Sequence, residues 1–244
     1  MMKKLNIALL GYGKMGREIE KIAIEKGHAI IAKIDNTKDW QQQKEALLLA
    51  DVAIDFSVPE SAKANMVACF DLQLPLVVGT TAWYQDLDEM TQICQQNESA
   101  LLWASNFSIG VNLLLKINSY AAELMSQFPQ YQVSLHEIHH TQKLDAPSGT
   151  AITIAQGVLQ ANNGLKSWRL LEEEDSISNS ELPITYERIG QVSGTHILTY
   201  TSEVDEISIK HEAKSRAGFA IGAVLAAEWL IGKTGVFTME DVLA

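Results

Sequence analysis

The chain has 244 residues, 47% of them hydrophobic, and its 30 acidic residues outnumber its 19 basic residues to give a net charge of −11. This length can bury the core of one large domain or two small ones, and the acidic balance excludes a general nucleic-acid binder, which needs clustered Lys and Arg. Two scattered cysteines, no signal-peptide pattern and no apolar run of about 18 residues favour a cytoplasmic protein without a membrane partner.

The first hundred residues alternate between short apolar runs and segments with helical spacing. The predicted elements, in chain order, are a strand at 5–10, a helix at 15–26, strands at 29–34 and 52–56, a helix from 59, a strand at 74–78, a helix at 87–96 and a strand at 100–104. Strands that alternate with helices predict a parallel sheet covered on both faces.

The pattern changes after Phe107, which suggests a domain boundary near residues 105–110. Helices are predicted at 111–128, 150–161 and 218–231, and strands at 131–138, 184–192, 196–202 and 206–211. These strands predict an antiparallel or mixed sheet, with a hairpin at Ser193-Gly194. The polar stretch 162–183, which contains the acidic run 172–175, predicts a solvated loop.

The first strand ends in the pattern GxGxxG, formed by Gly11-Tyr12-Gly13-Lys14-Met15-Gly16. In a dinucleotide-binding turn the first glycine permits the tight bend, the second lets the backbone approach the pyrophosphate, and the third lets helix and strand pack closely. The amide groups at the start of the following helix then face the phosphates. Because the pattern lies between a predicted strand and a predicted helix, it indicates a dinucleotide site; the alternative is a purely structural turn.

An acidic residue lies where such a site needs one. Asp35 stands 19 residues after Gly16, at the end of the second predicted strand. Its carboxylate can accept hydrogen bonds from the ribose hydroxyls and would repel a 2′-phosphate, so it favours NAD over NADP. Three nearby lysines could weaken this preference: Lys14, Lys33 and Lys38.

One segment matches the zinc-protease pattern HExxH, as His136-Glu137-Ile138-His139-His140. That pattern requires a helix, in which residues i and i+4 share a face. The surrounding residues predict a strand, where four residues span roughly 13 Å, which is too far for two rings to bind one ion. No histidine lies six residues after His140 either, so we expect no metal here.

The same region predicts a proton-donor and anion site. A histidine can donate a proton near neutral pH, and Lys143 adds a fixed positive charge. Ser148-Gly149-Thr150 opens a helix just after a proline, so its free amides and hydroxyls could hold a carboxylate. These features together suggest a small, strongly anionic substrate, although any single histidine could be an ordinary hydrogen-bonded residue.

The segment 139–150, HHTQKLDAPSGT, resembles the signature of the 4-hydroxy-tetrahydrodipicolinate (dihydrodipicolinate) reductases of the diaminopimelate and lysine pathway. The resemblance extends over nearly the whole chain. The other similar segments are the glycine loop, 79–81, 106–108, 110–112, 188–190, 194–196, 211–213, Arg216, 219–220 and 222–223.

The resemblance implies an α/β fold with two domains. Residues 1–107 and 217–244 would form a discontinuous dinucleotide-binding domain with a Rossmann-type parallel sheet. Residues 108–216 would form a smaller α+β domain that binds the substrate. Its open mixed sheet would join the subunits into a homotetramer.

The resemblance also implies the chemistry. Hydride would pass from NADH or NADPH to C4 of the substrate ring, with no metal, to yield tetrahydrodipicolinate. His139 would donate the proton and Lys143 would assist. The residues that would hold the two carboxylates are His140, Lys143, Ser148, Gly149 and Thr150. The residues that would position the nicotinamide are Gly79, Thr80, Thr81, Ala104, Ser105, Asn106 and Phe107.

The sequence departs from the common family pattern in places that bear on the cofactor. The glycine loop is one residue shorter than in many members, Ala82 stands where a glycine often follows Gly-Thr-Thr, and Asn36 stands where an Arg can bind the NADP phosphate. The chain is also short between Asp35 and Asp51. We therefore expect NADH to serve at least as well as NADPH. The alternatives are another two-domain dehydrogenase, for instance of an amino acid, and a non-catalytic nucleotide sensor.

Overall fold

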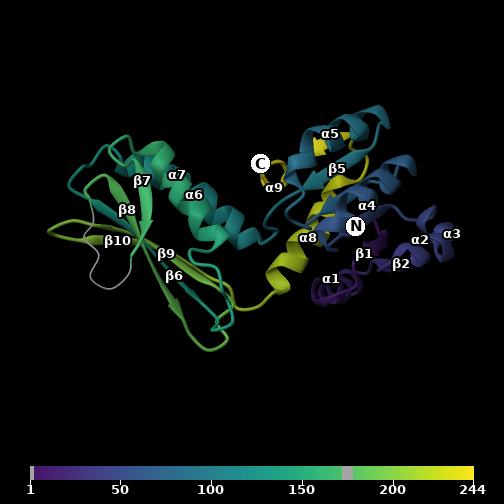
Figure 1. Cartoon of the computed structure of the whole chain (residues 1–244), viewed down its shortest axis with the longest axis horizontal. Helices are drawn as coiled ribbons and strands as arrows, with labels where there is room; N and C mark the ends of the chain where they lie inside the picture. Colours follow the sequence, from purple (N-terminus) through teal and green to yellow (C-terminus); the bar gives the residue numbers. More distant parts are fainter. Residues whose placement is uncertain (1–2, 172–177) are drawn as a thin grey trace. The chain divides into compact units, whose positions relative to one another are not determined.

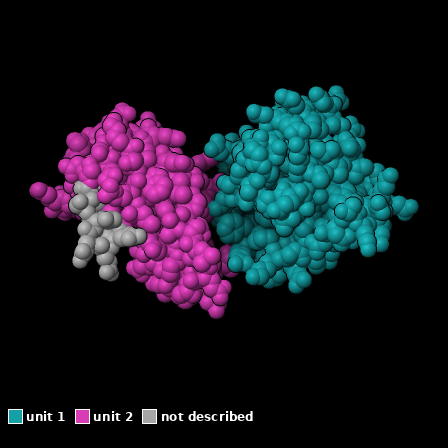
Figure 2. Space-filling model, viewed as in Figure 1, with its two compact units in different colours: residues 1–109, 216–244 teal, residues 110–215 magenta. Residues whose placement is uncertain are grey.

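The chain divides into two units in the computed structural model, which describes residues 3–171 and 178–244 (Figures 1 and 2). The first unit comprises Met1–Ile109 with Arg216–Ala244, and the second comprises Gly110–Ser215. The acidic run 172–175 lies outside the described residues.

The first unit is built on a six-stranded sheet in the order β11-β5-β4-β3-β1-β2, in which every pair of neighbours is parallel. This confirms the predicted parallel sheet; β11 was not predicted. The strands are β1 (Asn6–Leu10), β2 (Ala29–Ile34), β3 (Val52–Asp55), β4 (Leu76–Val78), β5 (Ala100–Trp103) and β11 (Gly235–Phe237).

Helices cover both faces of this sheet because successive strand residues point to opposite sides. Ile7 and Ile54 pack with α1 and α8, whereas Ala8 and Ala53 pack with α4 and α5. The helices are α1 (Lys14–Glu25), α2 (Thr37–Gln42), α3 (Lys44–Leu47), α4 (Pro59–Asp71), α5 (Leu87–Gln96), α8 (Ala217–Leu230) and α9 (Met239–Val242), with a 3₁₀ turn η1 (Tyr84–Asp86).

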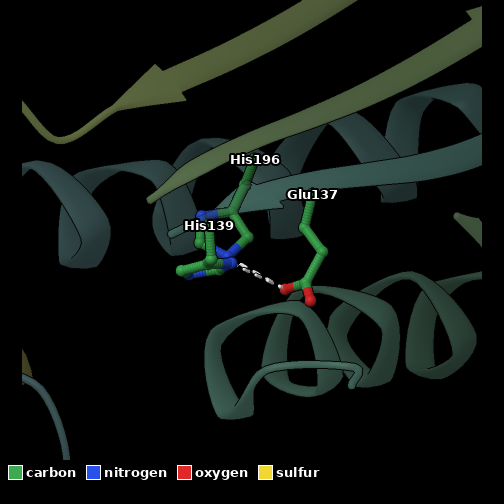
Figure 3. A group of neighbouring side chains, drawn as sticks. All are labelled: Glu137, His139 and His196. Atoms are coloured by element: carbon green, nitrogen blue, oxygen red, sulfur yellow. Dashed lines mark ion pairs between the residues drawn. The ribbon is translucent and has the colours of Figure 1, made fainter. Parts of the chain in front are cut away.

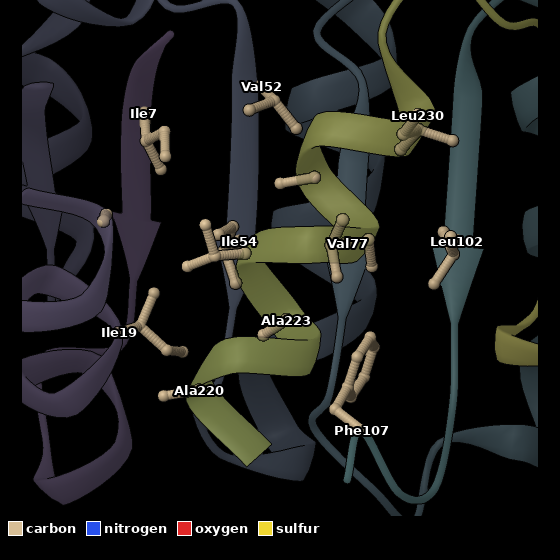
Figure 4. Packing of buried hydrophobic residues seen from close by; sticks show 14 of the residues in the cluster. Ile7, Ile19, Val52, Ile54, Val77, Leu102, Phe107, Ala220, Ala223 and Leu230 are labelled. Atoms are coloured by element: carbon tan, nitrogen blue, oxygen red, sulfur yellow. The ribbon is translucent and has the colours of Figure 1, made fainter. Parts of the chain in front are cut away.

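Helix α8 belongs to the C-terminal segment of the first unit and packs against the sheet formed by the N-terminal segment. It is apolar almost all round, which is typical of a helix buried in a core, and its buried residues include Ala220, Ala223 and Leu230. Figure 4 shows α8 lying across the strands that carry Ile54 and Val77. Among the described residues, no helix is both long enough and apolar enough to span a membrane.

The second unit contains a five-stranded sheet in the order β10-β9-β6-β8-β7. This sheet is mixed, as predicted, but its strand β7 was not predicted. Residues of α6 (Ile109–Met125) and α7 (Gly149–Ala161) form one core with the sheet, in which Leu114 and Ile154 join Leu135. The strands are β6 (Gln132–His139), β7 (Ser167–Leu170), β8 (Glu181–Arg188), β9 (Thr195–Thr201) and β10 (Glu206–Glu212).

Two predictions about this sheet are wrong. No hairpin forms at Ser193-Gly194, because β6 lies between β8 and β9 and pairs with β8 in parallel and with β9 in antiparallel fashion. The stretch 162–183 is not all loop, since it contains β7 and the start of β8. Trp168 and Leu170 pack against the core, so an edge strand forms within a polar sequence.

Candidate functional site

The glycine loop occupies the turn between β1 and α1. Gly11 has φ +86°, and a Cβ there would lie 2.4 Å from the carbonyl oxygen of Phe56. A Cβ on Gly16 would lie 2.3 Å from the carbonyl oxygen of Gly11. By contrast, a Cβ on Gly13 would meet nothing within 4 Å, and no side chain caps the start of α1. The turn therefore has the exposed backbone that a pyrophosphate requires.

Asp35 lies at the end of β2 beside this turn. Its Oδ1 accepts a hydrogen bond of 2.6 Å from the Tyr12 amide. Lys33 was predicted to weaken the preference for NAD by attracting a 2′-phosphate. The Lys33 ammonium lies 2.7 Å from the Glu20 carboxylate, and this ion pair opposes that effect. Asn36 caps α2 and is bonded to Asp39. Asp35 is therefore held against the glycine loop.

A buried carboxylate anchors the loop that follows β4. Asp55, fully buried at the end of β3, accepts hydrogen bonds from the Thr80 hydroxyl at 2.7 Å and from Asn65 at 2.9 Å. Ala82 has φ +64°, the left-handed conformation that favours glycine. An alanine therefore adopts this backbone conformation at a position where the sequence comparison pointed to glycine.

The remaining predicted cofactor residues lie after β5. The Ala104 amide donates to the Val78 carbonyl at 3.2 Å, Asn106 accepts a hydrogen bond from the Ser108 amide, and Phe107 is buried. Like the glycine loop, Asp35 and the 79–81 loop, they follow the carboxyl ends of parallel strands, so the structure brings these four segments to one edge of the sheet. Nucleotides bind at this edge in open α/β sheets.

The predicted substrate residues lie at the end of β6, in the loop that follows and at the start of α7. His139 is the last residue of β6 and is buried. The Lys143 ammonium lies 2.6 Å from the Asp145 carboxylate. Ser148 caps α7 by accepting a hydrogen bond from the Ala151 amide. A Cβ on Gly149 would meet nothing within 4 Å, so the backbone at the helix start is accessible.

A carboxylate that the sequence did not assign to the site lies at its centre. Glu137 is fully buried on β6 and accepts hydrogen bonds from the Ser148 amide at 3.1 Å and from Arg188 at 3.2 Å. Its Oε2 lies 3.5 Å from Nδ1 of His139 and 3.7 Å from Nε2 of His196 (Figure 3). One carboxylate thus faces four groups, from β6, β8, β9 and α7.

Both histidines of this cluster have lowered pKa values. Burial lowers the pKa of His139, and the negative charge of Glu137 opposes that effect. Burial also lowers the pKa of His196 to about 4, and the neighbouring His139 adds to the shift. His196 is therefore neutral at physiological pH, and its Nε2 shares a hydrogen bond of 3.1 Å with the Ser148 hydroxyl.

The first four residues of the HExxH pattern lie on β6, as predicted, and His140 follows the strand. His136 is hydrogen-bonded to Thr185. A different trio, Glu137, His139 and His196, does offer ligand atoms within 4.8 Å of one another. Its carboxylate already binds Arg188, whose positive charge disfavours a cation at that point.

Comparison with known proteins identifies the family. Residues 5–107 match the family model described as dihydrodipicolinate reductase, N-terminus, and residues 110–243 match the model of its C-terminus. The chain belongs to the dihydrodipicolinate reductase family. It is 48% identical to the 4-hydroxy-tetrahydrodipicolinate reductase of Christiangramia forsetii over 98% of both chains. The reductase of Natronomonas pharaonis is 35% identical over 98% of this chain and 100% of its own.

A solved reductase confirms the fold. The dipicolinate-bound dihydrodipicolinate reductase of Paenisporosarcina sp. TG-14 superposes with a TM-score of 0.77 at 22% identity, over 97% of this chain and 98% of its own. Family membership confirms the predicted activity: an NAD(P)H-dependent oxidoreductase, 4-hydroxy-tetrahydrodipicolinate reductase, of lysine biosynthesis.

Three residues of the cluster around Glu137 were not assigned a role from the sequence: Glu137, Arg188 and His196. The strand period offered a signal, because residues 137 and 139 of a strand share a face. The partners come from the sheet register, which pairs Glu137 with His196 and His139 with Arg188. That register joins residues about 50 positions apart, and no local pattern encodes it.

Proposed function

We propose that His139 donates the proton and Lys143 assists as donor and carboxylate anchor when this reductase converts 4-hydroxy-tetrahydrodipicolinate to tetrahydrodipicolinate. In the overall reaction the 4-hydroxyl leaves as water, and bound NAD(P)H would supply the hydride that adds to C4. One observation carries the proposal. Glu137 faces both His139 and the amide of Ser148. This one buried carboxylate therefore contacts the proposed proton donor and the residue that begins α7. A histidine that can protonate a ring carbon thus lies close to amides that can hold the ring's carboxylate.

The substrate that we propose is a small dicarboxylate dianion. The solved relative binds dipicolinate, a dicarboxylate, and the groups proposed to receive the carboxylates here are His140, Lys143, Ser148, Gly149 and Thr150. Because the chain has a net charge of −11, long-range attraction would oppose the approach of a dianion. Binding would depend on these local groups.

The proposed cofactor is NADH, used at least as well as NADPH, and it supplies the hydride when bound. The glycine loop would receive the pyrophosphate and Asp35 the ribose. The loops at 79–81 and 104–107 would position the nicotinamide. The proposal includes a homotetramer in the cytoplasm and no metal.

Asp35→Ala should raise KM for NADH about tenfold or more, while kcat changes little, because the ribose loses a charged hydrogen-bond acceptor. The measurement is steady-state NADH oxidation. Asp35 also accepts the Tyr12 amide, so the control is Asp51→Ala. Asp51 likewise accepts a backbone amide, from Asn6, but near the start of β1. An unchanged KM in Asp35→Ala, or an equal rise in Asp51→Ala, would refute the ribose assignment.

The whole proposal is tested by following NADH and NADPH oxidation with substrate freshly made from pyruvate and aspartate semialdehyde. We expect turnover that requires this substrate, that persists with a chelator, and that is at least as efficient with NADH. A hundredfold higher kcat/KM for NADPH would overturn the cofactor proposal. Loss of turnover on chelation would overturn the metal-free one.

A further inference from the structure

The environment of Glu137 is unusual for a carboxylate. It has no exposed surface, yet it is not a simple ion pair. Arg188 donates to its Oε1, the Ser148 amide donates to both of its oxygens, and two histidine rings approach its Oε2. Hydrogen bonds from an arginine and an amide stabilise the ionised form of a buried carboxylate. The charge of Glu137 is thus kept within 3.5 Å of the His139 ring.

We propose that Glu137 is the positioning residue for the proton donor: it holds a proton on Nδ1 of His139, so that Nε2 is the nitrogen that gains and loses the catalytic proton. The proposal rests on the proposed function, in which His139 is the donor. A carboxylate that faces one ring nitrogen sets the tautomer and the orientation of the imidazole.

The geometry around the ring supports this assignment. Within the described part of the chain, Nδ1 of His139 has no hydrogen-bond partner, and Oε2 of Glu137 at 3.5 Å is the acceptor that it faces. Catalytic hydrogen bonds are often this long before substrate binds. The Nε2 edge lies over Gly194, where a Cβ would be 3.0 Å away. The missing side chain at Gly194 leaves space next to Nε2.

Among the charged groups around His139, Glu137 is the one placed to stabilise the protonated ring. The positive groups that face it are Lys143 in the following loop and Arg188 on β8, and both lower its pKa, as burial does. Asp145 opposes them but is exposed and bound to Lys143. The ring of His196, on β9, lies 5.2 Å away, and His211 on β10 acts on His196. Glu137 is therefore the main buried group that favours protonated His139.

The test compares Glu137→Gln with wild type in the intact reductase. The substituted glutamine would keep the shape of the side chain but lose its charge, so kcat should fall about tenfold to a hundredfold at neutral pH. Since His139 must be protonated to act, the rate should decline as pH rises through the pKa of His139. Without the charge of Glu137 that decline should begin at lower pH. Glu137→Asp should partly restore both the rate and the profile.

Further measurements distinguish a positioning role of Glu137 from a purely structural one. Nitrogen-15 NMR of the histidines should show neutral His139 protonated on Nδ1 in wild type and on Nε2 in Glu137→Gln. The affinity for NADH and the thermal midpoint serve as folding checks. Glu203→Gln, at an exposed site in the turn after β9, should leave the rate and the pH profile unchanged.

The outcomes are distinguishable. If His139→Gln retains full activity, the proposed function itself fails. If His139→Gln is inactive but Glu137→Gln keeps the wild-type rate and pH profile, only the positioning role is refuted. The proposal would also be overturned if Glu137→Gln were slow but kept the wild-type pH profile, and if Glu137→Asp did not restore the rate. Glu137 would then have only a structural role. Should Glu137→Gln not fold, an Nε2-protonated neutral His139 in wild type would overturn it equally.

Discussion

Lys143→Ala is expected to lower kcat about 10²- to 10⁴-fold, with the Kd for NADH within about twofold of wild type. Among the residues that the structure describes, the exposed Asp145 is the only carboxylate paired with the Lys143 ammonium, at 2.6 Å. A substrate carboxylate can replace that partner without breaking a buried contact. The variant therefore loses a charge that stabilises the reacting dianion, and it loses little of the fold.

Single-turnover kinetics and NADH titration would measure the two quantities separately. Lys166→Ala is the matched control, because Lys166 donates to a nearby carbonyl on the surface of the same unit and should change neither quantity. Turnover like that of wild type in Lys143→Ala would refute the role of this lysine. An equal loss of NADH affinity would place it at the cofactor instead.

Gly222→Ala should lower the free energy of unfolding by about 3 kcal/mol. A Cβ at this position would lie 1.7 Å from the carbonyl oxygen of Phe107 and 2.9 Å from its carbonyl carbon. Because this neighbour is backbone, it cannot move aside as a flexible side chain could. Phe107 also ends the segment proposed to position the nicotinamide, so weaker NADH binding should accompany the loss of stability.

Chemical denaturation of Gly222→Ala and Gly218→Ala would test this contact. Gly218 lies one turn earlier in the same helix, and a Cβ there would come no closer than 3.7 Å, to the Ser108 hydroxyl. Alanine is the better helix former by about 1 kcal/mol, so Gly218→Ala should match or exceed the wild-type stability. Equal stability in both variants would refute the close approach of α8 to residue 107.

The first unit was predictable to a large extent because its signals are local. The glycine pattern and the apolar strand runs each lie within a few neighbouring residues, and the alternation of strand and helix implies a parallel sheet. Short elements escaped prediction. Helices α2 and α3 and strand β11 are only 6, 4 and 3 residues long, too short for periodicity to appear.

The second unit shows where local patterns fail. Ser193-Gly194 has the composition of a hairpin turn, yet the chain at this point leads from β8 across to the far side of β6. Gly194 has φ +147° and lies under the His139 ring. Its lack of a side chain thus serves the site, where the sequence indicated only a turn.

The sequence by itself determined the family, the reaction and the residues proposed as donor and anchor, His139 and Lys143, because the signature lies in one continuous segment. Only the tertiary structure decided that Arg188, His196 and Ser148 all lie around the buried carboxylate of Glu137. These residues come from three strands and a helix start, and their meeting depends on strand order and register. Both are set by the burial of whole sheet faces over long separations, which no window of neighbouring residues contains.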